Sequence, residues 1–136
     1  MGQINLLAVV LGALAFFAIG ALWYGPLFGK PWKAAIGWTR GDLPYPTSKC
    51  PMWLIMLLAF LFELLIAVML AHLIVRTGAP RHVIMMMAVG FGATIMTPAL
   101  GINYLFQQRP GKLFAIDAGY LIVGMAAMGA VFVAFA

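Results

Sequence analysis

The sequence predicts an all-α membrane protein with four transmembrane helices and a short interfacial helix in the first connection. Of its 136 residues, 65% are hydrophobic and only 8% are charged, and the apolar residues fall into four long runs. Soluble domains carry about 25% charged residues, so this composition cannot supply a water-facing surface. Segments that cross lipid are helical because every backbone amide needs a partner within the segment. The composition therefore excludes a soluble enzyme, a disordered chain and a nucleic-acid-binding protein.

Each of the four apolar runs is long enough to cross a bilayer, which takes about 20 mostly apolar residues. We expect spans at about residues 4–24, 52–75, 82–106 and 113–135, forming a single transmembrane domain over residues 1–136. No Lys or Arg precedes the first run, which is also too long for the apolar core of a signal peptide. We therefore expect it to remain as a permanent span.

The basic residues predict the orientation of the chain in the membrane. Six of the eight fall in the first and third connections, namely Lys30, Lys33, Arg40, Lys49, Arg109 and Lys112. Cytoplasmic connections carry an excess of Lys and Arg. We therefore expect both termini on the outside, and Cys50, which follows Lys49, on the cytoplasmic side.

An uncommon motif ends the first predicted span. It consists of Trp23, Tyr24, Gly25, Pro26 and, in the short helix that Pro31 can open, Trp32. The aromatic rings suit headgroup depth, the glycine allows a left-handed helix cap and its proline neighbour prevents continuation of the helix. The short helix suits the plane of the headgroups. We interpret this stretch as an interfacial anchor, with a binding or gating loop as the alternative.

This motif resembles the signature of a family of small four-span bacterial membrane proteins described only as a domain of unknown function. The matching run is Gly20-Ala21-Leu22-Trp23-Tyr24-Gly25-Pro26-Leu27-Phe28-Gly29-Lys30-Pro31-Trp32, and Ile4-Asn5-Leu6-Leu7-Ala8-Val9 resembles the family's opening. The number of spans and the length match across nearly the whole chain. The resemblance implies the four-span fold and a multi-pass location in the bacterial inner (cytoplasmic) membrane. It implies no activity, substrate or cofactor.

Glu63 is a charged residue near the middle of the second predicted span, where a charge is costly and needs a reason. It lies about 17 Å from Met52 by the helix rise, close to the midplane of a bilayer. Ala59, Ala67 and Ala71 share its face of the helix at four-residue spacing. Small residues collect where another helix comes close. We therefore expect Glu63 to face protein or a cavity rather than lipid.

The third predicted span offers partners for Glu63. Thr94 and Thr97 share a helix face, and Pro98 removes the hydrogen bond that the carbonyl of Thr94 would accept. A carboxyl group, two hydroxyls and a free carbonyl at one depth suit a proton or a small cation. The alternative is a protonated Glu63 that Thr94 or Thr97 holds as a structural contact.

Asp117 is the second acid in a predicted span. It lies about one turn inside Lys112, at a depth similar to that of Asn103. We expect Asp117 to pair with Lys112, Arg109 or Asn103. Alternatively, it opens towards Glu63 and outlines a path from the cytoplasmic side, with water bridging the gap.

No cofactor or metal is expected. Cys50 is the single cysteine, which excludes a multi-thiolate site. His72 and His82 flank the second connection and can approach one another to hold a haem or metal, but a histidine near water at a helix end is more often unligated. The three methionines that begin at Met85 point in three directions around a helix and are better explained as packing.

Two functional hypotheses remain. The first is a small oligomeric transporter or channel for a proton, cation or small solute that uses Glu63. The second is a non-transporting accessory or structural membrane protein that binds partner proteins or lipids. We do not expect an enzyme, because no Ser–His or Cys–His arrangement occurs at a common depth. A row of Ala126, Ala130 and Ala134 favours helix association, so the expected partners are the lipid bilayer and further copies of the chain, and no nucleic acid.

Overall fold

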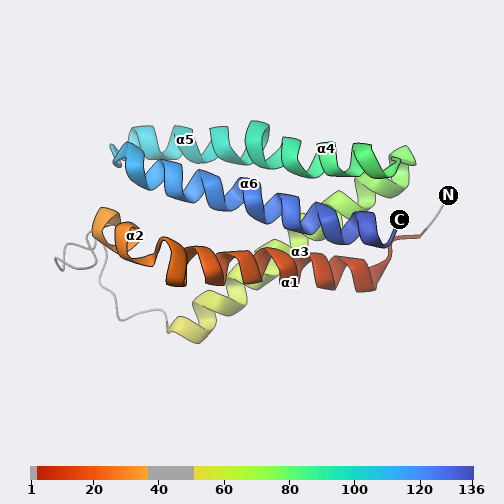
Figure 1. Cartoon of the computed structure of the whole chain (residues 1–136), viewed down its shortest axis with the longest axis horizontal. Coiled ribbons are helices and arrows are strands. Elements are labelled where there is room, and N and C mark those ends of the chain that lie inside the picture. Colours follow the sequence, from red (N-terminus) through yellow and green to blue (C-terminus); the bar gives the residue numbers. More distant parts are fainter. Residues whose placement is uncertain (1–2, 37–50) are drawn as a thin grey trace.

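The computed structural model describes residues 3–36 and 51–136, and within these ranges it contains helices and no strands (Figure 1). In chain order the elements are α1 (Leu6–Leu22), the π-helical turn η1 (Trp23–Leu27), α2 (Gly29–Ile36), α3 (Met52–Thr77), α4 (Arg81–Phe91), the π-helical segment η3 (Gly92–Met96), α5 (Thr97–Phe106) and α6 (Gly111–Ala134). Four stretches are long and apolar enough to cross a membrane: Leu6–Leu27, Met52–Thr77, Arg81–Phe106 and Gly111–Ala134. The predicted all-α polytopic fold class is confirmed, and each of these stretches begins and ends within one helical turn of a predicted apolar run.

Helix α6 lies at the centre of the bundle. It packs against α1 on one side and against α4, η3 and α5 on the other, whereas α3 crosses behind and packs mainly on α1 (Figure 1). As a result, 44% of the apolar 18-residue stretch of α6 is buried within the chain, compared with 17% of the corresponding stretch between Arg81 and Phe106. The remaining apolar surface of the outer spans is the kind that lipid covers.

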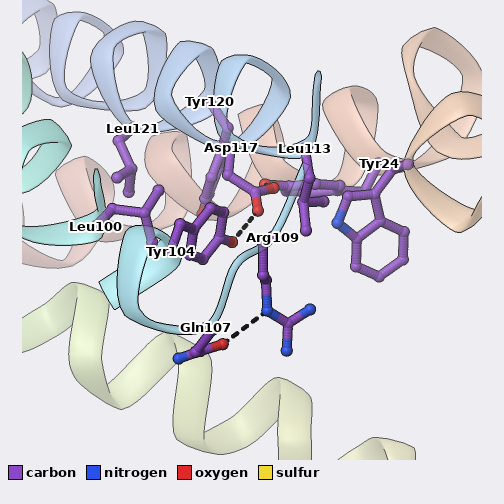
Figure 2. A pocket seen from close by; sticks show the side chains of 10 residues that line it. Tyr24, Leu100, Tyr104, Gln107, Arg109, Leu113, Asp117, Tyr120 and Leu121 are labelled. Carbon is purple, nitrogen blue, oxygen red and sulfur yellow. Dashed lines mark hydrogen bonds between the residues drawn. The ribbon is translucent and has the colours of Figure 1, made fainter. Parts of the chain in front are cut away.

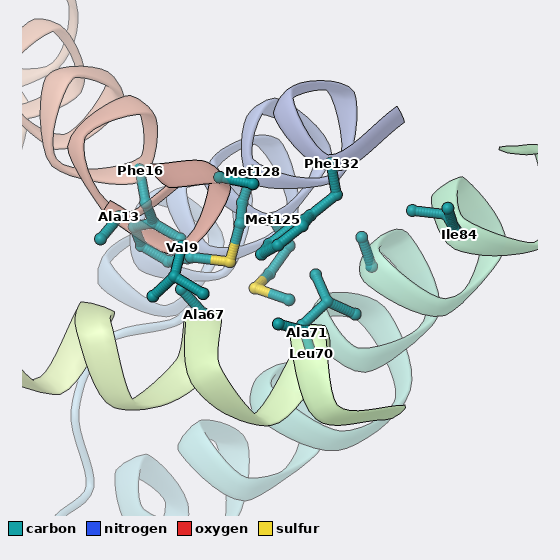
Figure 3. Packing of buried hydrophobic residues seen from close by; sticks show 12 residues of the cluster. Val9, Ala13, Phe16, Ala67, Leu70, Ala71, Ile84, Met125, Met128 and Phe132 are labelled. Atoms are coloured by element: carbon teal, nitrogen blue, oxygen red, sulfur yellow. The ribbon is translucent and has the colours of Figure 1, made fainter. Parts of the chain in front are cut away.

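The core forms where α6 meets α1 and α3 (Figure 3). Met125 and Met128 of α6 are fully buried and lie in one cluster with Phe16 of α1 and Leu70 of α3. Small residues allow this close packing: a Cβ added to Gly124 would lie 3.0 Å from a ring carbon of Phe16. Glycine therefore sets the distance between α6 and α1.

The N-terminal end of α1 and the C-terminal end of α6 lie at one end of the bundle, and α2 and the α5–α6 turn lie at the other (Figure 1). The guanidinium of Arg81, at the start of α4, donates a 3.0 Å hydrogen bond to the carbonyl of Ala136, which joins the α3–α4 turn to the C-terminal end. The described basic residues of the predicted first and third connections therefore lie at a single end of the bundle. They are on α2 and around the α5–α6 turn.

The prediction that Gly25 caps the first helix in a left-handed conformation is wrong. The only described glycine with a positive φ is Gly78, at the end of α3. The helix instead widens into η1, in which the Phe28 amide donates to the carbonyl of Trp23 at 2.7 Å, five residues back. Pro26 has no amide hydrogen to donate, and a π-helical turn accommodates it without stopping the chain. The second π-helical segment, η3, ends at Met96, two residues before Pro98, whereas Pro26 lies inside η1.

Helix α2 confirms that a short helix follows the first span. It begins at Gly29, two residues before the predicted Pro31, because the π-helical turn leads directly into it. A Cβ at Gly29 would lie 2.7 Å from the carbonyl oxygen of Tyr24, so this tight connection requires glycine. Arg40, Lys49 and Cys50 lie outside the described residues.

Candidate functional site

Asp117 of α6 accepts hydrogen bonds from two tyrosines on other elements. The hydroxyl of Tyr24 in η1 donates to Oδ1, and the hydroxyl of Tyr104 in α5 donates to Oδ2 (Figure 2). The Asp117 side chain is buried, with 9% of the residue exposed. The carboxylate therefore holds three separate segments of the chain together at one end of the bundle.

The predicted partners of Asp117 are wrong. Asn103 and Lys112 are exposed, and the Arg109 Nε donates to Oε1 of Gln107 at 2.7 Å. The tyrosine next to Asn103 reaches Asp117 in its place. Tyrosine reaches further than asparagine and buries an apolar ring while its hydroxyl finds a partner.

The motif that ends the first span, here called the Trp-Tyr motif after Trp23 and Tyr24, packs on α6 in addition to its expected role at the membrane interface. The indole Nε1 of Trp23 donates a 2.8 Å hydrogen bond to the carbonyl of Ile116, one residue before Asp117. The ring of Tyr24 meets that of Trp32 in α2 edge to face, with centroids 5.0 Å apart. Trp23 and Tyr24 thus fix η1 onto the first half of α6, and the ring of Tyr24 joins α2 to them.

A glycine on α6 makes room for the motif. A Cβ at Gly119 would lie 2.8 Å from Cζ2 of the Trp23 ring. We therefore expect Gly119→Ala to displace the indole, break its bond to Ile116 and lower the free energy of unfolding by about 1–3 kcal/mol, in spite of the better helix propensity of alanine. Reversible unfolding in detergent measures the change.

Gly90→Ala is the matched control for Gly119→Ala. Gly90 lies inside α4, and an added Cβ there meets nothing within 4 Å. We expect this variant to be as stable as the wild type or slightly more stable, because alanine is the better helix former. Equal effects of the two substitutions would contradict the docking role of Trp23.

A pocket of about 420 Å³ opens beside Asp117 (Figure 2). Four aromatic side chains contribute to its wall: Tyr24, Trp32, Tyr104 and Tyr120. Leu100, Leu113 and Leu121 supply apolar surface, and Gln107 and Arg109 supply polar groups. Its size lies within the range of small-molecule sites, which is about 300–1,000 Å³.

Glu63 lies deeper in the bundle and is bound by α6. The residue is 6% exposed, and its Oε1 accepts a 2.9 Å hydrogen bond from the hydroxyl of Tyr120. Its Oε2 is buried without a hydrogen-bond partner, the one such side-chain atom within residues 3–36 and 51–136. Ala67 and Ala71, on the same helix face, are also buried. The prediction that Glu63 faces protein is therefore confirmed.

The predicted partners of Glu63 on the third span are wrong. The hydroxyl of Thr94 donates to the carbonyl of Gly90 at 2.5 Å, and that of Thr97 donates to the carbonyl of Gly92 at 2.7 Å. Serine and threonine readily satisfy their hydroxyls on their own helix in this way. In addition, η3 packs on α6, while α3 meets α4 only weakly.

The two acids are brought near one another through tyrosine rings. Tyr24, bound to Asp117, and Tyr120, bound to Glu63, meet edge to face with centroids 5.2 Å apart. The sequence analysis identified neither Tyr104 nor Tyr120 as a partner of the acids. A usable signal was the position of Tyr120, one turn beyond Asp117 and inside an apolar span, where its hydroxyl requires a buried partner.

The remaining candidate residues lie apart from these acids. His72 and His82 have exposed side chains on α3 and α4. Among the described residues, no group of three or more His, Cys, Asp or Glu side chains is placed to hold a metal ion. Ala130 and Ala134 lie on the exposed side of α6.

Comparison with known proteins identifies the family of the chain. No curated protein and no solved structure matches it. A family model described as a protein of unknown function, DUF1761, matches residues 7–133. The match includes Trp23, Tyr24, Glu63, Asp117 and Tyr120, the residues that join the two acids to the first helix. Because it covers nearly the whole four-span bundle, the chain belongs to the DUF1761 family of proteins of unknown function.

Proposed function

We propose that this protein is a small transporter or channel that moves a proton, a cation or a small solute across the bacterial cytoplasmic membrane, with Glu63 as its coupling residue. One observation carries the proposal: Glu63 is buried at mid-span, and its Oε2 has no hydrogen-bond partner among the described residues. An unpaired buried polar atom costs about 1–3 kcal/mol. An acid with a purely structural role would use both oxygens, whereas an acid that exchanges a proton or ligand needs a free one.

The pocket and the tyrosines offer a route between Glu63 and one end of the bundle. Both Asp117 and Tyr120 line the pocket, so the hydroxyl that binds Glu63 belongs to a pocket-lining side chain. Glu63 itself does not line it. Movement of a proton, cation or solute between the pocket and Glu63 therefore requires rotation of the Tyr120 side chain or the entry of water beside it.

A reconstituted flux assay tests the proposed function. The purified protein is placed in liposomes that contain a pH-sensitive or cation-sensitive dye, and an ion gradient is applied. We expect faster dissipation of the gradient than in protein-free liposomes. A rate equal to that of protein-free liposomes for protons and for monovalent cations would refute ion transport and favour a non-transporting accessory or structural protein that binds partner proteins or lipids.

An exposed row of small residues supports the proposal that the protein acts as a homo-oligomer. Ala130 and Ala134 face away from the bundle, whereas the adjacent Gly129 packs inside it, where an added Cβ would lie 2.7 Å from that of Ala88. Small exposed residues on a membrane helix permit close approach of a second helix. A second copy of the chain is the partner we propose for this row.

Ala130→Leu separates contacts between subunits from contacts within one chain. Because Ala130 is exposed, we expect the thermal stability of the single bundle to be unchanged and the mass of the complex in detergent to fall towards that of one chain. Light scattering of wild type and variant measures the mass. A monomeric wild-type protein would remove the oligomer proposal.

We further propose that α2 and the α5–α6 turn face the cytoplasm and that both termini lie outside, because the described basic residues of α2 and of the α5–α6 turn share one end of the bundle. Cys50, the only cysteine, tests this orientation. An impermeant maleimide should label it only after the membrane of intact cells has been opened. Strong labelling of sealed cells would reverse the orientation.

A further inference from the structure

We propose that the pocket beside Asp117 binds the anionic head of an amphiphile, a phosphate or carboxylate attached to a hydrocarbon body, and that Arg109 holds the anion. The pocket is formed by η1, α2, α5, the α5–α6 turn and the first half of α6. Under the proposed function this pocket also lies on the route to Glu63, but binding of the amphiphile does not require transport and is tested without a flux assay.

The lining of the pocket changes from polar to apolar along the bundle. Gln107 and Arg109 belong to the α5–α6 turn, at the end of the bundle, and lie together on one side of the pocket (Figure 2). Leu100 and Leu121 lie further along α5 and α6. Between Leu113 and Leu121 the α6 helix advances about 12 Å. A ligand that matches this gradient has a polar head at the turn and an apolar body directed into the bundle.

Arg109 is the charged group of the pocket that is able to bind a ligand. Asp117 already receives a tyrosine hydroxyl on each oxygen. Arg109 is positioned by its bond from Nε to Gln107 and by the ring of Tyr104, whose centroid lies 5.8 Å from its guanidinium carbon. Its two terminal nitrogens form no hydrogen bond to the described residues. A guanidinium whose terminal nitrogens have no partner within the described ranges is suited to a phosphate or carboxylate, which it can bind with two parallel hydrogen bonds.

The basic residues around the pocket also favour an anion. Lys112, in the first turn of α6, and Lys30 of α2 are exposed at the same end of the bundle. Both add basic side chains to that of Arg109, so the electrostatic potential around the pocket attracts anions. A cationic amphiphile would meet Arg109, and a bare inorganic anion would leave the apolar part of the pocket unfilled.

The test measures equilibrium binding of radiolabelled decyl phosphate to the purified full chain in an uncharged detergent. We expect saturable binding that decanoate displaces, and much weaker displacement by inorganic phosphate or decyltrimethylammonium at equal concentration. Arg109→Gln should weaken binding about tenfold or more, because a charge-assisted contact is lost. Arg109→Lys should bind with intermediate affinity, since it keeps the charge and loses the paired geometry.

Arg76→Gln is the matched control. Arg76 is exposed in the last turn of α3, at the opposite end of the bundle, and we expect unchanged affinity. Unfolding curves recorded without ligand show whether each variant is folded. Should Arg109→Gln not fold, Arg109→Lys carries the test through its reduced affinity for decyl phosphate. Wild-type affinity in the folded variant, or equal displacement by decyltrimethylammonium, would overturn the proposal.

A second experiment distinguishes a membrane lipid from a soluble amphiphile as the natural source of the anion. The chain is transferred to nanodiscs of neutral phosphatidylcholine or of phosphatidylcholine with phosphatidylglycerol, and decyl phosphate binding is repeated. Loss of binding in the phosphatidylglycerol discs identifies a membrane lipid as the occupant. Retained binding identifies a soluble amphiphile, and both results support an anionic site. Absence of binding in neutral discs would refute it.

Discussion

Replacing Glu63 by glutamine should abolish ion flux in reconstituted liposomes and leave the fold intact. Glutamine has the same size and still accepts the hydrogen bond from Tyr120, but it cannot gain or lose a proton. A coupling residue must change its protonation or its ligand during each cycle. The measurement compares the initial rate of gradient dissipation in wild-type and Glu63→Gln liposomes at equal protein content.

Thr94→Val is the control that this structure provides. The Thr94 hydroxyl donates to its own helix, and valine preserves the shape of the side chain, so we expect wild-type flux. The original hypothesis, in which Thr94 joins Glu63 in an ion site, predicts a loss. A Glu63→Gln variant with wild-type flux would refute the coupling role, and the accessory-protein hypothesis would then be preferred.

Two further variants separate stability from flux at Glu63. Glu63→Ala leaves the Tyr120 hydroxyl without its partner, and Tyr120→Phe leaves the carboxyl group without its donor. Each should lower the free energy of unfolding by about 0.6 kcal/mol, which is the average for hydrogen bonds between membrane helices, and up to about 1.7 kcal/mol. Glu63→Gln should be nearly as stable as the wild type, so a loss of flux in that variant cannot be attributed to unfolding.

The spans and the orientation of Glu63 could be predicted from the sequence because both follow from periodicity along a single helix. Bilayer thickness fixes the length of an apolar run, and the four apolar helices begin and end within one turn of the predicted runs. The spacing of Ala67 and Ala71 relative to Glu63 identifies the buried face of α3 without knowledge of its neighbour. Each of these predictions requires only the geometry of one helix.

The partners of the two acids could not be predicted, because they depend on which helices pack together. The sequence places Thr94 near the depth of Glu63, and α3 and α4 are joined by a short turn, so contact between them was the natural expectation. Helix α6 is the one that lies at the centre, however, and it supplies Tyr120. Helix periodicity gives the depth and face of a residue but does not specify the helix that it meets.

The Trp-Tyr motif shows a different limit of sequence reasoning. Tryptophan and tyrosine at a helix end are typical of membrane interfaces. In this chain their polar groups bind instead to α6, Trp23 at the carbonyl of Ile116 and Tyr24 at the carboxylate of Asp117. Composition cannot separate these roles, since both use an apolar ring with a polar edge.

The carboxylate of Asp117 should be the polar group that contributes most to the stability of the bundle end. Asp117→Ala removes the acceptor of two buried hydroxyls at once, those of Tyr24 and Tyr104. With about 0.6–1.7 kcal/mol for each hydrogen bond, we expect a loss of about 2 kcal/mol in the free energy of unfolding. Asp117→Asn should lose less, because its amide oxygen still accepts a hydrogen bond. Reversible unfolding in mixed detergent micelles measures both variants.

A double-mutant cycle assigns this loss to the tyrosines. In the wild-type background, Tyr24→Phe and Tyr104→Phe should each lower the free energy of unfolding, since each removes one hydrogen bond to Asp117. In the Asp117→Ala background both substitutions should be neutral or stabilising, because phenylalanine keeps the ring and removes a hydroxyl that has lost its partner. The hydroxyl of Tyr120 binds Glu63 and not Asp117, so Tyr120→Phe should lower the free energy of unfolding equally in both backgrounds. Equal costs of Tyr24→Phe with and without Asp117 would show that the carboxylate does not bind η1 to α6, and the assignment of the motif as a docking element would then rest on Trp23 alone.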